Sequence, residues 1–169
     1  MPCFNLHMFS MHMFSPQFLD WTRDLPIAVT IRNSGWMLPA IESAHLLGYA
    51  GIVGCAVAID FRILNMGLRR QTAAQIAAQL APWTAASLAL SIVTGALLFS
   101  YKPHTFAKNA AFPYKLALVA IAILFHYSLL RWAIRGTTPG NPAKLIAACS
   151  LALWLAVALA GMAVSLELF

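Results

Sequence analysis

Charged side chains are scarce in this chain of 169 residues, where aspartate, glutamate, lysine and arginine together make up only 9%. Hydrophobic side chains make up 61%, and this balance lies well outside the range of soluble domains. The scarcity of charge therefore excludes an ordinary soluble protein. The net charge of +6 comes from dispersed basic residues rather than from one patch, so we expect no nucleic-acid partner.

Cysteine is also scarce, and its spacing excludes two kinds of site. Cys3, Cys55 and Cys149 lie far apart, so the chain has neither a CxxC pair nor the CxxCH pattern of covalent haem attachment. We interpret Cys55 and Cys149, which fall within apolar stretches, as small packing residues.

Long apolar runs are what the chain does have. A helix that crosses a bilayer needs about 20 mostly apolar residues. Backbone polar groups in lipid must be satisfied within the segment, so each such run must be a helix. The sequence therefore predicts an all-α fold, a four-helix transmembrane bundle whose first partner is the lipid bilayer. The expected spans are about 36–63, 73–101, 111–134 and 143–166.

Residues 1–35 precede this bundle of 36–169 and form the second predicted unit. Ser15-Pro16 has the pattern of an N-cap followed by proline at the first helical position. Apolar and charged side chains then alternate as in an amphipathic helix that lies in the membrane interface. Pro26 is expected to break this helix, and the segment is placed to form a lid over a site near the outer surface.

The first residues contain a local duplication, in which His7-Met8-Phe9-Ser10 recurs as His12-Met13-Phe14-Ser15. Thioether and thiolate ligands suit Cu(I), so a copper-binding tail is one hypothesis. The alternative is that residues 1–12 do not belong to the native protein, because several methionines here are possible translation starts.

Two histidines, His45 and His126, lie deep inside predicted spans. Ionisable side chains in hydrocarbon are rare and face a bundle interior or a functional site. Imidazole is the commonest metal-binding side chain and holds haem iron in many proteins. We predict that both bind one haem b axially, although their depths differ by about five residues, or roughly 7 Å, which requires tilted helices. One alternative is that each histidine binds separately with a second ligand, and another is that both are hydrogen-bonded between helices.

Other polar residues surround His45 in the first span. Glu42 lies one turn before it in a Glu-x-x-His pattern and is a candidate metal ligand, while Tyr49 lies one turn after it and is a candidate cofactor contact. A ridge of small residues runs beside these side chains. It indicates either close approach of another helix or room for a flat macrocycle. The ridge consists of Ala44, Gly48, Gly51, Cys55 and Ala58.

Lys115 is a further candidate for cofactor binding, because three helical turns place it on the same face as His126. Its ammonium group either reaches the lipid headgroups or pairs with a haem propionate, with Glu42 or with a quinone oxygen. The second span carries a polar stripe whose hydroxyls are expected to bond back to their own helix. The stripe consists of Thr84, Ser87, Ser91 and Thr94, with Gly95 beside it.

Several of these residues resemble a known pattern. Residues 36–48, Asp60-Phe61-Arg62, Thr94-Gly95 and residues 109–115 resemble an uncharacterised family of small bacterial four-span membrane proteins. More distantly, residues 115–127 are similar to the third span of the haem-containing membrane protoporphyrinogen oxidase, whose first span also has a histidine. Copper-resistance D-type membrane proteins share the general layout. The tryptophan-rich surroundings expected of the oxidase are missing here. These likenesses imply haem b but no particular reaction.

Three functional hypotheses follow. The first is a small b-type cytochrome that passes electrons between a quinone and a redox partner protein. The second is a membrane oxidoreductase of the protoporphyrinogen oxidase type, which uses haem and Lys115. The third is a structural, accessory or metal-handling membrane subunit without haem.

Basic residues predict the orientation of the bundle in a bacterial inner membrane. The loops after the first and third spans are richer in arginine than the opposite side, which favours a cytoplasmic position for them and extracytoplasmic termini. Asp60 and Arg62 are interpreted as interfacial anchors at this end. The basic residues of these loops are Arg62, Arg69, Arg70, Arg131, Arg135 and Lys144.

A reporter that is active only outside the cytoplasm should therefore give signal when it is fused after Phe169. The same reporter inserted beside Arg69 should be silent. Activity from the second fusion with silence from the first would invert the orientation.

Overall fold

Four long helices form the body of the protein. The computed structural model describes residues 14–66, 70–130 and 141–166. Each long helix is long and apolar enough to cross a membrane, so the predicted four-helix transmembrane fold is confirmed. The helices are α4 (Met37–Ile63), α5 (Ala73–Tyr101), α7 (Ala111–Phe125) with its π-helical continuation η1 (His126–Leu130), and α9 (Asn141–Leu166).

The ends of the helices follow from local chemistry. α5 covers the predicted span, and it begins at a capping box in which Thr72 and Gln75 satisfy each other's backbone N–H groups. The third span differs from its prediction, because regular α-helix ends at Phe125 and a π-helical turn begins at His126. Residues 131–134 of that predicted span lie outside the described residues.

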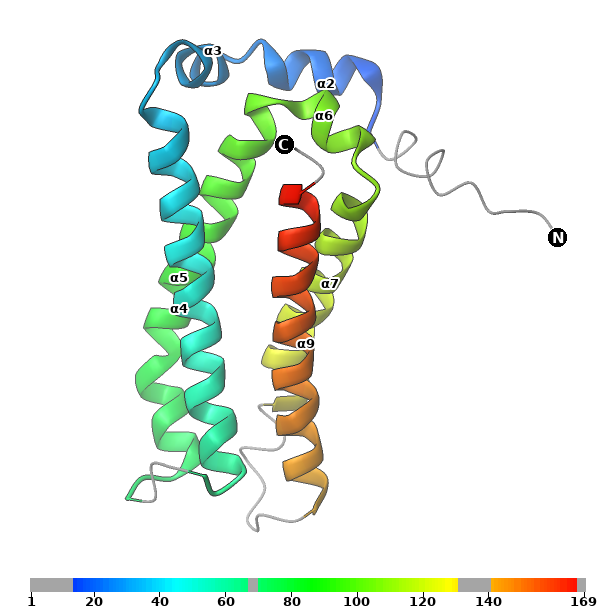
Figure 1. Ribbon diagram of the computed structural model, residues 1–169. Coiled ribbons are helices and arrows are strands. Elements are labelled where there is room, and N and C mark those ends of the chain that lie inside the picture. The colour runs from blue at the N-terminus through cyan, green and yellow to red at the C-terminus, as the bar shows by residue number, and fades with distance from the viewer. Residues whose placement is uncertain (1–13, 67–69, 131–140, 167–169) are drawn as a thin grey trace, which may run out of the picture.

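The four helices form two antiparallel pairs (Figure 1). α4 packs most extensively against α5 and α7 against α9, while contacts between α4 and α9 join the pairs. One apolar cluster, here called the middle cluster, holds α4, α7 and α9 together and contains Ile52, Ala56, Ala122, Trp154 and Val157. A second, the loop-end cluster, joins α4, α5 and α9 through Ile59, Ile63, Ile76, Ala143 and Ala147.

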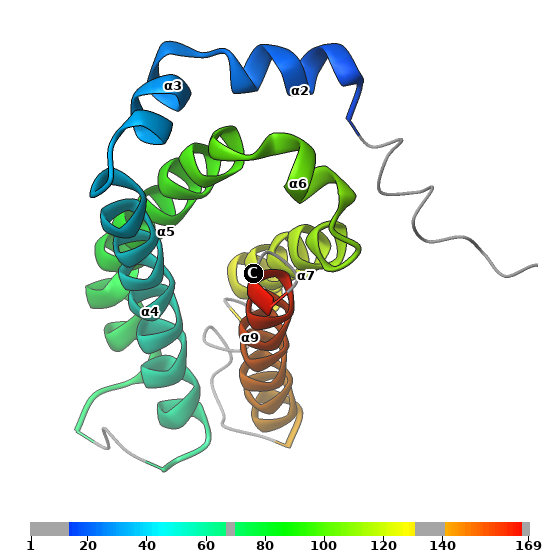
Figure 2. The same cartoon turned by 45° about the horizontal axis from the view of Figure 1, so that its top comes forward.

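Three short helices cover the opposite end of the bundle, here called the cap end (Figure 2). They are α2 (Pro16–Arg23), α3 (Pro26–Asn33) and α6 (Pro103–Lys108). Ser15 caps α2 as predicted, with its hydroxyl accepting from the N–H of Phe18. The predicted break at Pro26 is confirmed, because this proline starts α3.

Polar contacts fasten the cap end to the long helices. The guanidinium of Arg32 on α3 donates to the carbonyls of Ser100 and Tyr101 at the end of α5, each at 3.5 Å. The buried Asn109 side chain donates to the carbonyl of Val164 on α9 at 3.1 Å. Its oxygen accepts from the first N–H groups of α7. Asn109 therefore satisfies backbone groups at the start of α7 and near the end of α9.

Among the helix contacts at the described glycines, the one between α4 and α5 is the closest. A Cβ atom at Gly48 would lie 3.0 Å from both the Ser87 carbonyl oxygen and the Ser91 backbone nitrogen. A Cβ atom at Gly51 would overlap the Ser87 hydroxyl. The small-residue ridge of α4 therefore serves close helix packing, and α5 occupies the space beside Gly48 and Gly51.

Gly48→Ala and Gly51→Ala should each destabilise the bundle by about 1–3 kcal/mol, because the added methyl group overpacks the α4–α5 contact. Gly54 offers a matched control on the same helix, since a Cβ there meets nothing within 4 Å. Unfolding of the purified variants in detergent measures the difference. Equal stability of the Gly48 and Gly54 variants would contradict the packing described here.

Candidate functional site

His45 lies on α4 with its ring held against α5. Its Nδ1 atom is 3.0 Å from the Thr94 hydroxyl oxygen. That hydroxyl donates its own hydrogen to the Leu90 carbonyl at 2.6 Å, so towards His45 it can only accept. This arrangement favours the tautomer in which Nδ1 carries the proton and Nε2 carries a lone pair.

Gly95 supplies the surface on which this ring lies. A Cβ atom at position 95 would be 3.2 Å from Cε1 and 3.6 Å from Nδ1 of His45. Any larger residue would press on the imidazole, so the pair Thr94-Gly95 forms a seat for His45. The sequence predicted the bond from Thr94 to its own helix correctly, but it did not predict that the same oxygen accepts from His45.

Lys115 faces the interior of the bundle from α7. A Cβ atom at Gly161 on α9 would lie 3.8 Å from its Cε and 3.9 Å from its Nζ. The lysine side chain is thus directed towards α9.

The middle cluster explains why Lys115 and His45 share one level. Lys115 precedes Ala122 by seven residues, and His45 precedes Ile52 by seven residues, while Ala122 and Ile52 belong to the same cluster. Both α4 and α7 run away from the cap end (Figure 1). At 1.5 Å per residue, both side chains originate about 10 Å from that cluster on its cap-end side.

His126 lies on the other side of the middle cluster. It follows Ala122 by four residues, so it originates about 6 Å beyond the cluster and roughly 16 Å from the level of His45. Counted along the helices, the two histidines thus originate on opposite sides of the middle cluster. His126 begins the π-helix η1, and its ring packs edge-on against Tyr127 with centroids 5.3 Å apart. Such π-helical turns are frequent at functional sites, and the sequence did not predict this one.

Tyr49 ties α4 to α9. Its hydroxyl donates to the Trp154 carbonyl at 2.7 Å, and the two rings lie 6.5 Å apart. The residue predicted to contact a cofactor therefore also joins the two helix pairs.

Glu42 lies one turn of α4 before His45, and its side chain is exposed. It forms no ion pair with Lys115. Within residues 14–66, 70–130 and 141–166, no three His, Cys, Asp or Glu side chains gather where a metal ion could be held. The proposed copper-binding tail lies outside the described residues.

Asp60 is where the sequence interpretation was wrong. The predicted interfacial anchor is 0% exposed, in the last two turns of α4, whereas its neighbour Arg62 does contact the loop through the Gln71 carbonyl and Asn65. The Ser150 hydroxyl of α9 faces the Asp60 carboxyl. No sequence signal distinguished a buried aspartate here from an exposed one.

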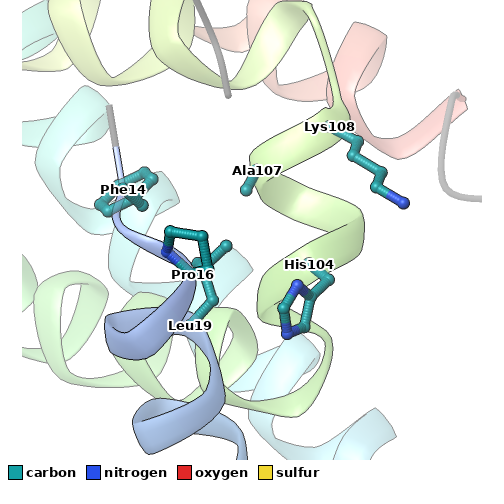
Figure 3. A pocket seen from close by; sticks show the side chains of 6 residues that line it. All are labelled: Phe14, Pro16, Leu19, His104, Ala107 and Lys108. Atoms are coloured by element: carbon teal, nitrogen blue, oxygen red, sulfur yellow. The ribbon is translucent and has the colours of Figure 1, made fainter. Parts of the chain in front are cut away.

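A small cavity of about 250 Å³ lies at the cap end between α2 and α6 (Figure 3). His104 forms one wall and is fixed at 2.9 Å from the Asp20 carboxylate on α2. Phe14 and Leu19 line it from the α2 side, and Lys108 lies at its rim. The segment predicted as a lid thus lines this cavity together with α6.

Comparison with known proteins gives the chain a family. The model of a family of unknown function (DUF6644) matches residues 20–167. The chain belongs to this family. No curated protein and no solved structure matches the chain. The predicted membership of an uncharacterised family is therefore confirmed, and the family brings no activity with it.

Removing the charge of Glu42 or Lys115 should have independent effects, because the two side chains do not meet. Glu42→Gln should change the free energy of unfolding by less than about 0.5 kcal/mol, as for other exposed positions. The effect of the double variant with Lys115→Met should equal the sum of the single effects within about 0.5 kcal/mol. Denaturant unfolding in detergent tests this, and a larger departure from the sum would show that the pair forms.

Proposed function

We propose that the protein is a small integral membrane b-type haem protein in which His45 would hold the haem iron. It would pass electrons between a quinone and a redox partner protein. The observation that carries the proposal is the orientation of the His45 ring. Metal-bound histidines generally donate their second nitrogen to a fixed acceptor, and the Nδ1 bond to Thr94 leaves Nε2 ready to bind.

The residues around His45 fit a haem in two respects. Nε2 is an unprotonated imidazole nitrogen inside an apolar bundle, which is the usual donor to haem iron. Lys115 lies at the same level and carries a positive charge with no anion beside it among the described residues. Its ammonium group would pair with a haem propionate. Counted along the helices, His126 originates beyond the middle cluster from His45, so we do not assign it to the same iron.

The chain's own contribution to the chemistry is positioning. Haem iron supplies one-electron transfer. Thr94 and Gly95 fix the plane and the protonation of the His45 ring, and Lys115 offers one counter-charge to an anionic ligand. A membrane enzyme of the protoporphyrinogen oxidase type would use the same residues, and turnover of protoporphyrinogen by the purified protein would distinguish it.

One observation favours a second candidate function, an accessory subunit without haem. The bond from His45 to Thr94 joins α4 to α5, so the histidine also acts as a polar link between helices. In that case Nε2 would have no ligand, and the role of the protein would lie in contacts with other membrane proteins.

The proposed location is the bacterial inner membrane, with the cap end extracytoplasmic. The loop charges support this orientation by the positive-inside rule. The first and last described residues lie towards the cap end, as four spans require (Figure 1).

An absorption spectrum of the protein purified from haem-replete cells tests the haem proposal. The wild type should show a b-type Soret band, and His45→Ala should abolish it. His126→Ala should retain the band, because this residue lies at another depth. His104→Ala is a matched control at the cap end. Folded wild-type protein without haem would overturn the proposal, and so would a band that survives in the His45 variant.

Thr94 gives a second test of the same site. Thr94→Val keeps the shape of the side chain but removes the acceptor that fixes Nδ1, so haem affinity should fall by about 10–100-fold. Thr94→Ser restores the hydroxyl and should recover most of that loss. Equal haem retention in the valine and serine variants would show that the bond does not orient a ligand.

A further inference from the structure

Asp60 and Ser150 form a polar pair sealed inside the bundle, far from the His45 site. Asp60 is 0% exposed on α4, and Ser150 is 1% exposed on α9. The Ser150 hydroxyl faces the Asp60 carboxyl. Within the part of the chain that the structure describes, neither carboxylate oxygen of Asp60 has a partner in hydrogen-bond geometry. The hydroxyl oxygen of Ser150 has none there either. Two buried polar groups from different helices thus face each other with unused bonding capacity.

The surroundings of this pair are apolar. Ile59 precedes Asp60, and Ile63 follows one turn later, and both belong to the loop-end cluster with residues of α5 and α9. α5 contributes Ile76 to this cluster, and α9 contributes Ala143 and Ala147. An ionised carboxylate in such a place costs far more free energy than a neutral one unless a cation pairs with it.

No described cation pairs with Asp60. Arg62 on the same helix donates to the Gln71 carbonyl and to Asn65, so it is directed into the loop. On α9 the nearest charged side chain along the helix, Lys144, is exposed. The part of α5 that packs here, around Ile76, carries no titratable side chain. On α7 and η1, the titratable side chains described near this level are His126 and Tyr127.

We propose that Asp60 and Ser150 form a proton-binding site at the loop end of the bundle. The Asp60 carboxyl carries the proton at neutral pH and donates it in a hydrogen bond to the Ser150 hydroxyl. Release breaks the O–H bond, leaves the electron pair on the carboxylate, and passes the proton to water. α4 ends at Ile63, three residues beyond Asp60, so the site lies within about 5 Å of the helix end along its axis.

A protonated Asp60 would allow both Asp60 and Ser150 to form hydrogen bonds. A neutral carboxyl is one donor as well as an acceptor, whereas a carboxylate only accepts. A small rearrangement of the two side chains then allows the carboxyl to donate to Ser150 while the serine hydroxyl donates in return. The ligand of the site is therefore a proton, because a metal cation would need further oxygen ligands than one carboxyl and one hydroxyl.

Infrared spectroscopy of the full chain in liposomes tests this directly, since the chain contains only five Asp and Glu residues. At neutral pH the wild type should show the carbonyl stretch of a protonated carboxylic acid, which shifts in heavy water. Asp60→Asn should remove this band. Asp20→Asn, which changes an exposed carboxylate on α2, is the matched control and should retain it.

Ser150→Ala supplies a measurement that leaves Asp60 in place. Its carboxylic acid band should persist and move to higher frequency, because the hydrogen-bond acceptor is gone. Absence of the band in the folded wild type, or its survival in Asp60→Asn, would overturn the proposal. An unshifted band in Ser150→Ala would remove the serine from the site. Loss of the wild-type band on addition of sodium or potassium ions would show a metal-cation site instead.

Discussion

The close contact between α4 and α5 is the constraint on which the candidate site depends. Gly48 and Gly51 let the two helix backbones approach until Ser87 and Ser91 touch α4. Only at this separation can the His45 ring reach the Thr94 hydroxyl and lie on Gly95. In lipid, helices gain little from burying apolar surface against each other, so close packing and a polar bond between them carry more of the association. The same contact therefore holds the helices together and fixes the protonation of His45.

The bundle separates its ionisable groups into levels. His45 and Lys115 lie on the cap-end side of the middle cluster, while Asp60 and Ser150 lie towards the loop end. The apolar middle cluster, which includes Trp154 and Ala122, lies between these two levels.

Much of the fold was predictable because a membrane restricts what a chain can do. The starts of α4 and α5, the N-cap at Ser15 and the break at Pro26 follow from apolar length, capping chemistry and the missing N–H of proline. The end of the third span was not predictable in this way, because a π-helical turn at His126 leaves no mark in hydropathy. The ridge of small residues predicted close packing or space for a macrocycle, and only the position of α5 decided in favour of packing.

By itself the sequence determined that the chain is an all-α membrane protein with ionisable residues in its spans, because composition and run length are local properties. It also identified His45, His126 and Lys115 as ionisable residues inside the spans. The tertiary structure decided which of them meet. It placed Lys115 level with His45, moved His126 to another depth, left Glu42 exposed and buried Asp60 against Ser150. These outcomes depend on the vertical offset and rotation of one helix against the next. The packing of small and large side chains from all four helices sets both quantities at once, and no single stretch of sequence contains them.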